Sequence, residues 1–307
     1  MRKNILVTGG LGHIGSQIIR KLDHDITVVD NLLTQRYCSL FELDKKINFV
    51  ESDFSELDSS FLSTFDEILH FGAVTDAAGS FDNKEELEKH NVVSTKKLIN
   101  KFVDSTCKRF IFPSSTSVYG VAASVVDEDN DEYVNPQSPY AESKVEIENY
   151  LKLKIDPTTH NYIIPRFGTI YGFSIGMRFH TAINKFIWQS KMKEPLTIWK
   201  ENYKQYRPYL ELSDCVRSVQ HLLEIPYMDA KNNTIYNILT NNYTLEEVIE
   251  NLEKVFGKQE LNFVETPLLN QFSYKVNDSK IRRTGFVPSG DLQLSLVSTS
   301  VAMDGIR

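Results

Sequence analysis

The amino-acid sequence predicts an α/β protein in which a doubly wound parallel sheet is joined to a smaller α+β domain. In the first half, short apolar runs alternate with stretches of helical spacing, and this rhythm changes after about residue 172. Apolar runs that lack polar alternation are typical of strands covered by helices on both faces. Strands that alternate with helices in this way favour a parallel sheet.

The expected elements set the expected domain boundaries. The first half gives strands over residues 5–7, 26–29, 47–50, 68–71, 110–112 and 162–164, with helices over 15–22 and 87–103. The second half gives helices over 181–191, 214–223 and 245–256, the last opened by Thr244, and strands over 209–212 and 234–239. We expect one domain over residues 1–172 and a second over 173–307, with parts of about 209–240 rejoining the sheet.

Charge and composition argue against several classes of function. The formal net charge of −7, from 34 Lys plus Arg against 41 Asp plus Glu, disfavours a nucleic-acid binder but permits a small anionic ligand. No apolar run approaches the ~20 residues of a membrane span, and the N-terminus lacks a signal-peptide layout. The widely spaced Cys38, Cys107 and Cys215 suggest neither a disulfide framework nor a metal site. We expect a cytoplasmic protein that contacts neither membrane nor nucleic acid and binds no metal.

A glycine-rich turn follows the first strand. Gly9, Gly12 and Gly15 form the pattern G-x-x-G-x-x-G, which includes His13 and Ile14, and a helix follows. The first glycine permits a tight turn, the second lets the backbone approach a pyrophosphate, and the third lets the helix pack close to the strand. The free N–H groups at the helix N-terminus favour phosphate. A tight strand-to-helix turn without a ligand is the alternative, but the position in the first βαβ unit predicts a Rossmann dinucleotide site.

The second strand ends in Asp30, which is followed by Asn31. A carboxylate at this position can accept both hydroxyls of an adenosine ribose and repels a 2′-phosphate, which favours NAD over NADP. The alternative is that these two residues form a turn that caps itself.

Tyr140 and Lys144 lie four residues apart in a helix that Ser138 and Pro139 are expected to start, so both project from one helix face. A phenol has a pKa of ~10, and a neighbouring ammonium with a cationic nicotinamide could lower it by the about three units that a base at neutral pH requires. Such a pair alone is common on helix surfaces. Upstream, however, residues 113–120 place hydroxyl groups at the carboxyl end of a strand, where open α/β sheets bind ligands.

These features together resemble the extended short-chain dehydrogenase/reductase family, and within it the NAD-dependent nucleotide-sugar epimerases and dehydratases. The similarity is specific over residues 8–15, 30–32, 70–73, 115–120 and 140–144, and looser over 165–172 and 207–214. It implies NAD as the cofactor and a nucleotide-diphosphate sugar as the substrate. It also implies a homodimer that pairs through the helices near 87–103 and 140–151.

The resemblance assigns roles to individual residues. Tyr140 would be the base, Lys144 its activator, and Ser115 the group that hydrogen-bonds the reacting sugar hydroxyl. Besides the glycine turn and Asp30, the implied cofactor contacts are Asn31, Asp53, Phe54, Phe71, Gly72, Ala73, Asn91, Ser114, Phe167 and the Tyr140–Lys144 pair. The implied substrate contacts are Thr75, Thr116, Thr169, Arg178, Asn184 and Arg207, of which Arg207 would bind the diphosphate.

Several of these roles have structural alternatives. Asp53 could cap the segment after its strand, Asn91 could be a satisfied buried amide, and Arg178 and Arg207 could be surface cations. The sequence also departs from the family pattern, because Thr116 and Ser117 stand where dehydratases carry Asp and Glu. The family's deoxysugar epimerase-reductases carry a Cys in this loop, which is absent here, and Thr169 replaces an Asn of many 4-epimerases. Dehydration is therefore not expected.

The function that the resemblance implies is 4-epimerisation. Tyr140 would take the 4-OH proton, the C4 hydride would pass to NAD, and the transient 4-keto sugar would be reduced from the other face. The second candidate is a 4-dehydrogenase or 4-keto reductase with net redox. The third is an NAD-binding regulator without catalysis, against which the intact Ser115, Tyr140 and Lys144 argue.

Overall fold

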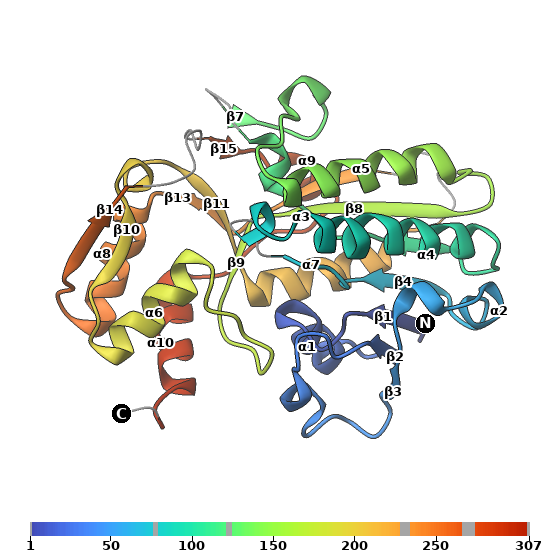
Figure 1. Ribbon diagram of the computed structural model, residues 1–307, viewed down its shortest axis with the longest axis horizontal. Coiled ribbons are helices and arrows are strands. Elements are labelled where there is room, and N and C mark those ends of the chain that lie inside the picture. Colours follow the sequence, from blue (N-terminus) through green and yellow to red (C-terminus); the bar gives the residue numbers. More distant parts are fainter. Residues whose placement is uncertain (1, 76–78, 121–124, 228–233, 266–273, 306–307) are drawn as a thin grey trace.

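The computed structural model describes residues 2–75, 79–120, 125–227, 234–265 and 274–305 (Figure 1). A main α/β layer and a smaller helical lobe lie side by side in this view. Among the described helices, none combines the length and the apolar character that crossing a bilayer would require.

The main sheet has the order β12-β8-β5-β4-β1-β2-β3, with β6 also paired to β8. Its neighbouring strands run parallel throughout. They are β1 (Asn4–Thr8), β2 (Asp25–Asp30), β3 (Asn48–Glu51), β4 (Glu67–His70), β5 (Arg109–Ile111), β6 (Ser114–Ser115), β8 (Asn161–Phe167) and β12 (Thr234–Ile238). The chain leaves β1 toward β2 on one side, while β4 lies on the other, which opens a crevice at the carboxyl ends of β1 and β4.

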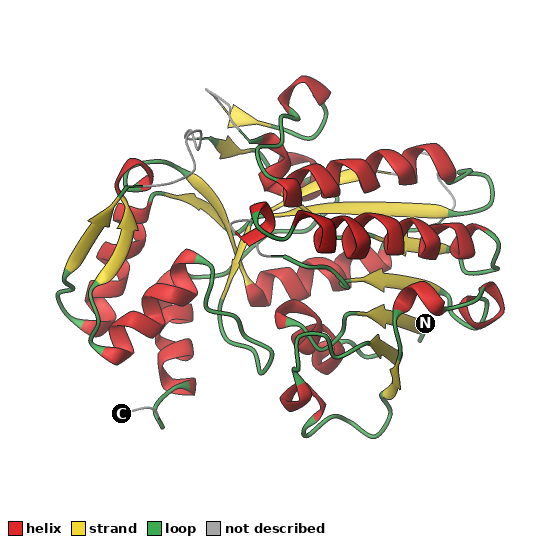
Figure 2. Ribbon diagram, viewed as in Figure 1, coloured by secondary structure: helices red, strands yellow, loops and turns green. Residues whose placement is uncertain are grey.

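Helices cover both faces of this sheet, as Figure 2 shows. α1 (His13–Lys21) and α7 (Leu212–Glu224) pack on one face, and α2 (Ser59–Leu62), α4 (Ser94–Val103) and α5 (Pro139–Lys154) on the other. In β1, Ile5 and Val7 point into the first core while Leu6 points into the second. This alternation has the period of two residues that a strand imposes. The predicted doubly wound Rossmann sheet is confirmed.

The helix expected over residues 87–103 is interrupted. It consists of α3 (Lys84–Leu87), a π-helical segment η4 (Glu88–Val93) and α4. A π turn inserts one extra residue into a helix and often marks a functional position. Here it contains Asn91, whose side chain is buried.

The second half builds its own core. α6 (Ala182–Met192), α8 (Leu245–Phe256) and α10 (Leu292–Ala302) pack with the parallel pair β10 (Leu196–Trp199) and β14 (Leu261–Val264). A capping box between Thr244 and Glu247 starts α8. β11 (Arg207–Glu211) pairs with β9 (Thr169–Tyr171) and β13 (Asn241–Tyr243). Because β12 and α7 join the main layer, residues beyond 172 contribute to both layers, and the expected boundary stays a prediction.

The remaining elements are short. They are β7 (Val125–Val126), β15 (Lys275–Val276) and α9 (Ser279–Arg282), with the 3-10 turns η1 (Tyr37–Leu40), η2 (Phe54–Glu56), η3 (Gly79–Phe81), η5 (Thr116–Tyr119), η6 (Asp131–Tyr133) and η7 (Lys200–Asn202). β7 and β15 pair in parallel, which joins two segments far apart in the sequence.

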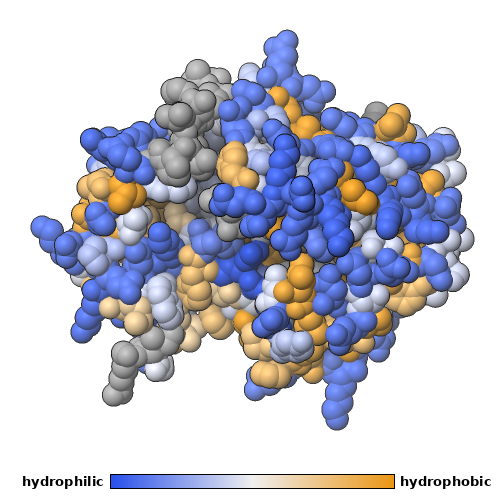
Figure 3. All heavy atoms as spheres, in the orientation of Figure 1, coloured by the Kyte–Doolittle hydropathy of each residue, from blue (hydrophilic) through white to orange (hydrophobic). Residues whose placement is uncertain are grey.

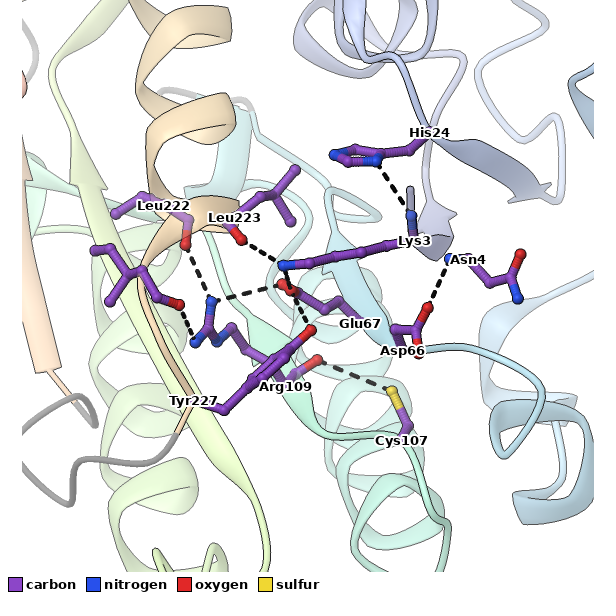
Figure 4. A network of polar contacts seen from close by, with 11 residues as sticks. Lys3, Asn4, His24, Asp66, Glu67, Cys107, Arg109, Leu222, Leu223 and Tyr227 are labelled. Atoms are coloured by element: carbon purple, nitrogen blue, oxygen red, sulfur yellow. Dashed lines mark hydrogen bonds and ion pairs between the residues drawn. The ribbon is translucent and has the colours of Figure 1, made fainter. Parts of the chain in front are cut away.

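A buried ion pair closes the amino end of the sheet (Figure 4). Glu67, the first residue of β4, accepts hydrogen bonds from Lys3 Nζ at 2.5 Å and from the Tyr227 hydroxyl at 2.6 Å. Arg109, the first residue of β5, lies 3.8 Å from Glu67 and donates to the Leu222 carbonyl at 3.1 Å. The side chains of Glu67 and Arg109 are fully buried. Lys3 and Arg109 thus donate to the Leu223 and Leu222 carbonyl groups near the end of α7, and both face the single carboxylate of Glu67.

We expect Glu67→Gln to lower the free energy of unfolding by about 3 kcal/mol, because it leaves the Arg109 charge buried without its partner. Asp129→Asn is the control, since it removes an exposed partner of Lys280 and should cost less than about 1 kcal/mol. Urea denaturation of the three proteins measures both effects. Equal losses in the two variants would contradict the assigned importance of the buried pair.

Candidate active site

The glycine turn brings the ends of β1 and β4 into contact. Gly9 has φ +68°, and a Cβ atom there would lie 2.4 Å from the Gly72 backbone nitrogen. Gly12 is the N-cap of α1 and carries no side-chain cap. A Cβ at Gly12 would meet only the Gly9 carbonyl oxygen, at 3.5 Å, so the space above the helix N-terminus is open. An open, uncapped helix N-terminus in this turn fits the pyrophosphate of a dinucleotide.

A pocket lies over the carboxyl ends of β1, β2 and β4. The predicted cofactor residues that line it are Gly9, Gly12, His13, Ile14, Gly15, Asp30, Asn31, Phe54, Phe71, Gly72 and Ala73. Thr75 and Arg178, which were predicted to contact substrate, line it as well. The sequence did not single out the other lining residues, Leu33, Thr34, Arg36, Val74 and His90. Residues from six separate segments therefore converge on one groove.

Asp30 both lines the pocket and caps its own turn. Its carboxylate accepts the backbone N–H of Leu32 at 2.9 Å and that of Leu11 at 3.2 Å. Asp53 is placed differently, because it is the N-cap of η2 and accepts the Ser55 N–H at 2.9 Å. The Asn31 side chain also donates to Asp53, at 3.1 Å. The capping alternatives are thus observed for both carboxylates, and their contacts with a cofactor stay predictions.

Asn91 supports the wall of the pocket from behind. Its amide accepts the Val74 N–H and donates to the Val74 carbonyl, both at 2.8 Å. The same amide reaches the hydroxyl of Ser143 on α5 at 3.5 Å. It therefore fixes the backbone after β4, and the π turn of η4 is the local feature that contains it.

The predicted catalytic residues lie together at the start of α5. Ser138 caps the helix by accepting the Ala141 N–H at 3.2 Å, which places Tyr140 in the first turn. Ser115, at the end of β6, lies close enough to the Tyr140 phenol that its side chain favours the ionised form of the phenol. Lys144 Nζ donates to the Pro113 carbonyl at 2.8 Å and also lies near the Tyr140 ring. A hydroxyl, a phenol and an ammonium group thus meet beside the cofactor crevice.

Burial dominates the protonation of this group. It raises the pKa of Tyr140 to about 12, although the charge of Arg178 and the side chain of Ser115 act in the opposite direction. Burial also lowers the pKa of Lys144 to about 8, against the attraction of Glu148. Near neutral pH the phenol is protonated and most of the lysine is charged. The phenol therefore needs further positive charge beside it before it can act as a base.

The segment of residues 172–178 crosses from the second half onto the glycine turn. The Gly176 N–H donates to Ser16 Oγ at 3.3 Å, and a Cβ at Gly176 would lie 2.7 Å from the Gly12 carbonyl oxygen. His13 Nε2 bonds the Gly172 carbonyl at 2.9 Å. Burial lowers the pKa of His13 to about 4, so this neutral ring carries its proton on Nε2. Arg36 and Arg178 flank the same side of the pocket.

Other predicted site residues have structural partners. Asn184 is buried, donates to the Arg178 carbonyl at 3.0 Å and accepts the Gly172 N–H at 3.1 Å, so it holds the 172–178 segment in place. The Thr116 hydroxyl donates to the carbonyl of the buried Phe167 at 3.3 Å. Ser114 is buried and donates to Glu148.

Arg207 and Thr169 lie on neighbouring strands away from this pocket. Thr169 of β9 is in register with Tyr209 of β11, and Arg207 begins β11. The Arg207 guanidinium lies 5.1 Å from the centre of the Tyr274 ring. Tyr274 donates to the Thr116 carbonyl at 3.1 Å and so links Arg207 to the loop that carries Ser115. No local pattern in the sequence marks Tyr274.

Comparisons with known proteins agree with this arrangement. Residues 5–238 match the model of the NAD dependent epimerase/dehydratase family. A UDP-glucose epimerase of Bacillus subtilis described as uncharacterised, YtcB, is 27% identical over 237 residues, which are 73% of each chain. A trifunctional UDP-glucose 4,6-dehydratase, 3,5-epimerase and 4-keto reductase of Arabidopsis thaliana is 29% identical over 308 residues. That match covers 92% of this chain and 45% of the plant protein.

Among solved structures, the fold is similar to the UDP-glucuronic acid 4-epimerase of Bacillus cereus in complex with UDP-glucuronic acid and NAD. The TM-score is 0.88 at 24% identity, covering 99% of this chain and 100% of that chain. The match to the family model covers most of the chain, and the glycine turn and the Tyr140–Lys144 pair lie within the matched residues. The chain therefore belongs to the NAD dependent epimerase/dehydratase family, and the cofactor that this family uses is NAD.

Proposed function

We propose that this chain is a nucleotide-sugar 4-epimerase that acts through a transient 4-keto sugar. The observation that carries the proposal is that Ser115, Tyr140 and Lys144 lie together next to the cofactor pocket. The epimerase names of the Bacillus subtilis and Bacillus cereus proteins support the reaction class. The substrate class, a nucleotide-diphosphate sugar, follows from the family.

In this proposal each side chain has one task. Ser115 hydrogen-bonds the 4-OH of the sugar and orients it toward Tyr140, whose phenolate oxygen removes the hydroxyl proton. Lys144 keeps a positive charge near the phenol and is held by the Pro113 carbonyl. When bound, NAD supplies reversible oxidation of the sugar carbon and, in its oxidised form, a positive charge that favours the phenolate. The oxygen of the 4-keto sugar is reprotonated by Tyr140 after the sugar has presented its other face.

Dehydration is not part of the proposal. It requires one group to take the C5 proton and another to protonate the leaving hydroxyl, and Thr116 and Ser117 are too weakly acidic and basic for these tasks. In addition, Thr116 is buried with its hydroxyl directed to Phe167. Net 4-oxidation or 4-keto reduction remains the second candidate, because it shares the first half-reaction.

We expect Tyr140→Phe to fold and to bind NAD, while turnover falls by about a hundredfold or more because the proton acceptor is lost. Tyr150→Phe is the matched control: it lies on the same helix, its hydroxyl bonds Asn100 at 2.7 Å, and its loss should leave turnover unchanged. Mass spectrometry of products from a panel of nucleotide sugars reads the outcome. An epimer keeps the substrate mass, whereas loss of two hydrogens indicates net oxidation and loss of water indicates dehydration. Either mass change as the main product, or turnover retained in Tyr140→Phe, contradicts the proposal.

We further propose that Asp30 selects NAD over NADP through its negative charge. Arg36 lines the same pocket and is a cation that a 2′-phosphate could use. Asp30→Ala should therefore weaken NAD about tenfold and bring the two affinities together. Asp25→Ala, at the opposite end of the same strand, is the control for strand stability. Calorimetric titration with both dinucleotides measures the preference, and an unchanged preference in Asp30→Ala would exclude this role.

We also propose a homodimer that pairs through α4 and α5, as the resemblance to the family implies. The face that these helices turn to the viewer is mostly hydrophilic in Figure 3, and Lys96 and Glu146 form an exposed ion pair across them. We expect light scattering to give twice the mass of the chain. Glu146→Arg should shift the protein toward monomer, whereas Glu250→Arg on the exposed side of α8 should not. A native protein that scatters as a monomer would contradict the dimer.

A further inference from the structure

A second buried ion pair lies directly behind the Tyr140–Lys144 pair. Glu148 follows Lys144 by one turn of α5 and is 1% exposed, and Arg166 of β8 is equally buried. The Glu148 carboxylate accepts Arg166 Nε at 3.0 Å and Nη2 at 2.6 Å. It also accepts the hydroxyl of Ser114, the neighbour of Ser115, at 2.5 Å.

The pair is fixed from its far side as well. Arg166 Nη1 donates to the Tyr119 hydroxyl at 3.0 Å, and that hydroxyl donates to Asn237 of β12 at 2.7 Å. Asn237 in turn donates to Glu128 at 2.8 Å. This continuous buried chain of hydrogen bonds holds the guanidinium in one place. A bidentate contact with a fixed guanidinium holds the Glu148 carboxylate in one geometry and directs it toward β8.

We propose that Glu148 is a positioning residue whose negative charge keeps Lys144 protonated while Lys144 Nζ keeps its hydrogen bond to the Pro113 carbonyl. The hydrogen bonds from Arg166 and Ser114 occupy the carboxylate, so it acts on Lys144 through its field while Lys144 Nζ stays on the Pro113 carbonyl. A field of this kind is strong in a buried site, because little water screens it. The inference rests on the proposed function for its purpose, since the charged lysine assists the Tyr140 phenolate.

Charged and titratable side chains surround Lys144. Tyr140 and Glu148 lie on its own helix, and Arg166 faces it from β8 behind Glu148. Burial lowers the pKa of the His70 ring of β4 to about 3, and the positive charge of Lys144 acts in the same direction. His70 therefore stays neutral. Burial lowers the pKa of Lys144, and Glu148 is the group that opposes this shift.

The test is a titration of the protein labelled with carbon-13 at the lysine Cε atoms, followed by NMR, with Lys144→Met used to assign the resonance. In the native protein the midpoint for Lys144 should lie near 8. In Glu148→Gln it should fall by about one pH unit or more, because the attraction is lost and the Arg166 charge remains. Glu148→Asp keeps the charge and should restore most of the midpoint.

Glu67→Gln is the matched control. It also removes the charge of a buried carboxylate that faces a buried arginine, but at the opposite end of the sheet. A general loss of stability acts on both variants, whereas only Glu148→Gln should move the Lys144 midpoint. If Glu148→Gln fails to fold, Glu148→Leu/Arg166→Met removes both charges, leaves none unpaired and should still lower the midpoint.

The outcomes separate this inference from the proposed function. An unchanged midpoint in folded Glu148→Gln, or the same shift in Glu67→Gln, overturns the inference even if the enzyme epimerises sugars. A shifted midpoint together with no turnover of any nucleotide sugar supports the role of Glu148 and overturns the proposed function. If the role of Glu148 and the proposed function are both correct, the alkaline limb of the pH–rate profile should move to lower pH in Glu148→Gln, in parallel with the NMR midpoint.

Discussion

The proposed active site requires one ammonium group to stay charged where little water can reach it. Lys144 is 5% exposed, lies 4.5 Å from the centre of the Phe112 ring and donates to the Pro113 carbonyl. Desolvation works against this charge, and the field of Glu148 works for it. The first turns of α5 pack against the loop after β5, where Lys144 Nζ bonds the Pro113 carbonyl. This packing brings the lysine, the phenol and Ser115 together.

The sheet order supplies the place for this group. β1 and β4 are neighbours, and Gly9 and Gly72 allow their following turns to touch. The resulting crevice runs from Asp30 past the N-terminus of α1 toward the start of α5. The 172–178 segment then covers one side of it, which ties the second half of the chain to the cofactor groove. The two halves therefore share one site, although each has its own core.

Two buried carboxylate–arginine pairs serve the two ends of the sheet in different ways. At the amino end, Arg109 is paired with Glu67 and donates to a carbonyl group at the end of α7 (Figure 4). At the carboxyl end, Glu148 and Arg166 lie next to Tyr140 and Lys144, the proposed reacting groups. Such pairs add little net stability once the cost of desolvation is counted, so their value lies in fixing geometry and local charge. The second pair is the one that can influence chemistry.

The sequence by itself determined the parallel sheet, the glycine turn and the Tyr140–Lys144 face, because strand period, helix period and glycine geometry depend on neighbouring residues. It did not find Arg36, Tyr274 or the Glu148–Arg166 pair. These side chains reach the site only when segments from different parts of the chain pack together. It also placed one unbroken helix where η4 inserts a π turn, because that turn is held by Asn91 bonding a distant backbone segment. Local periodicity thus fixed which elements form, and only tertiary packing decided which side chains the site contains.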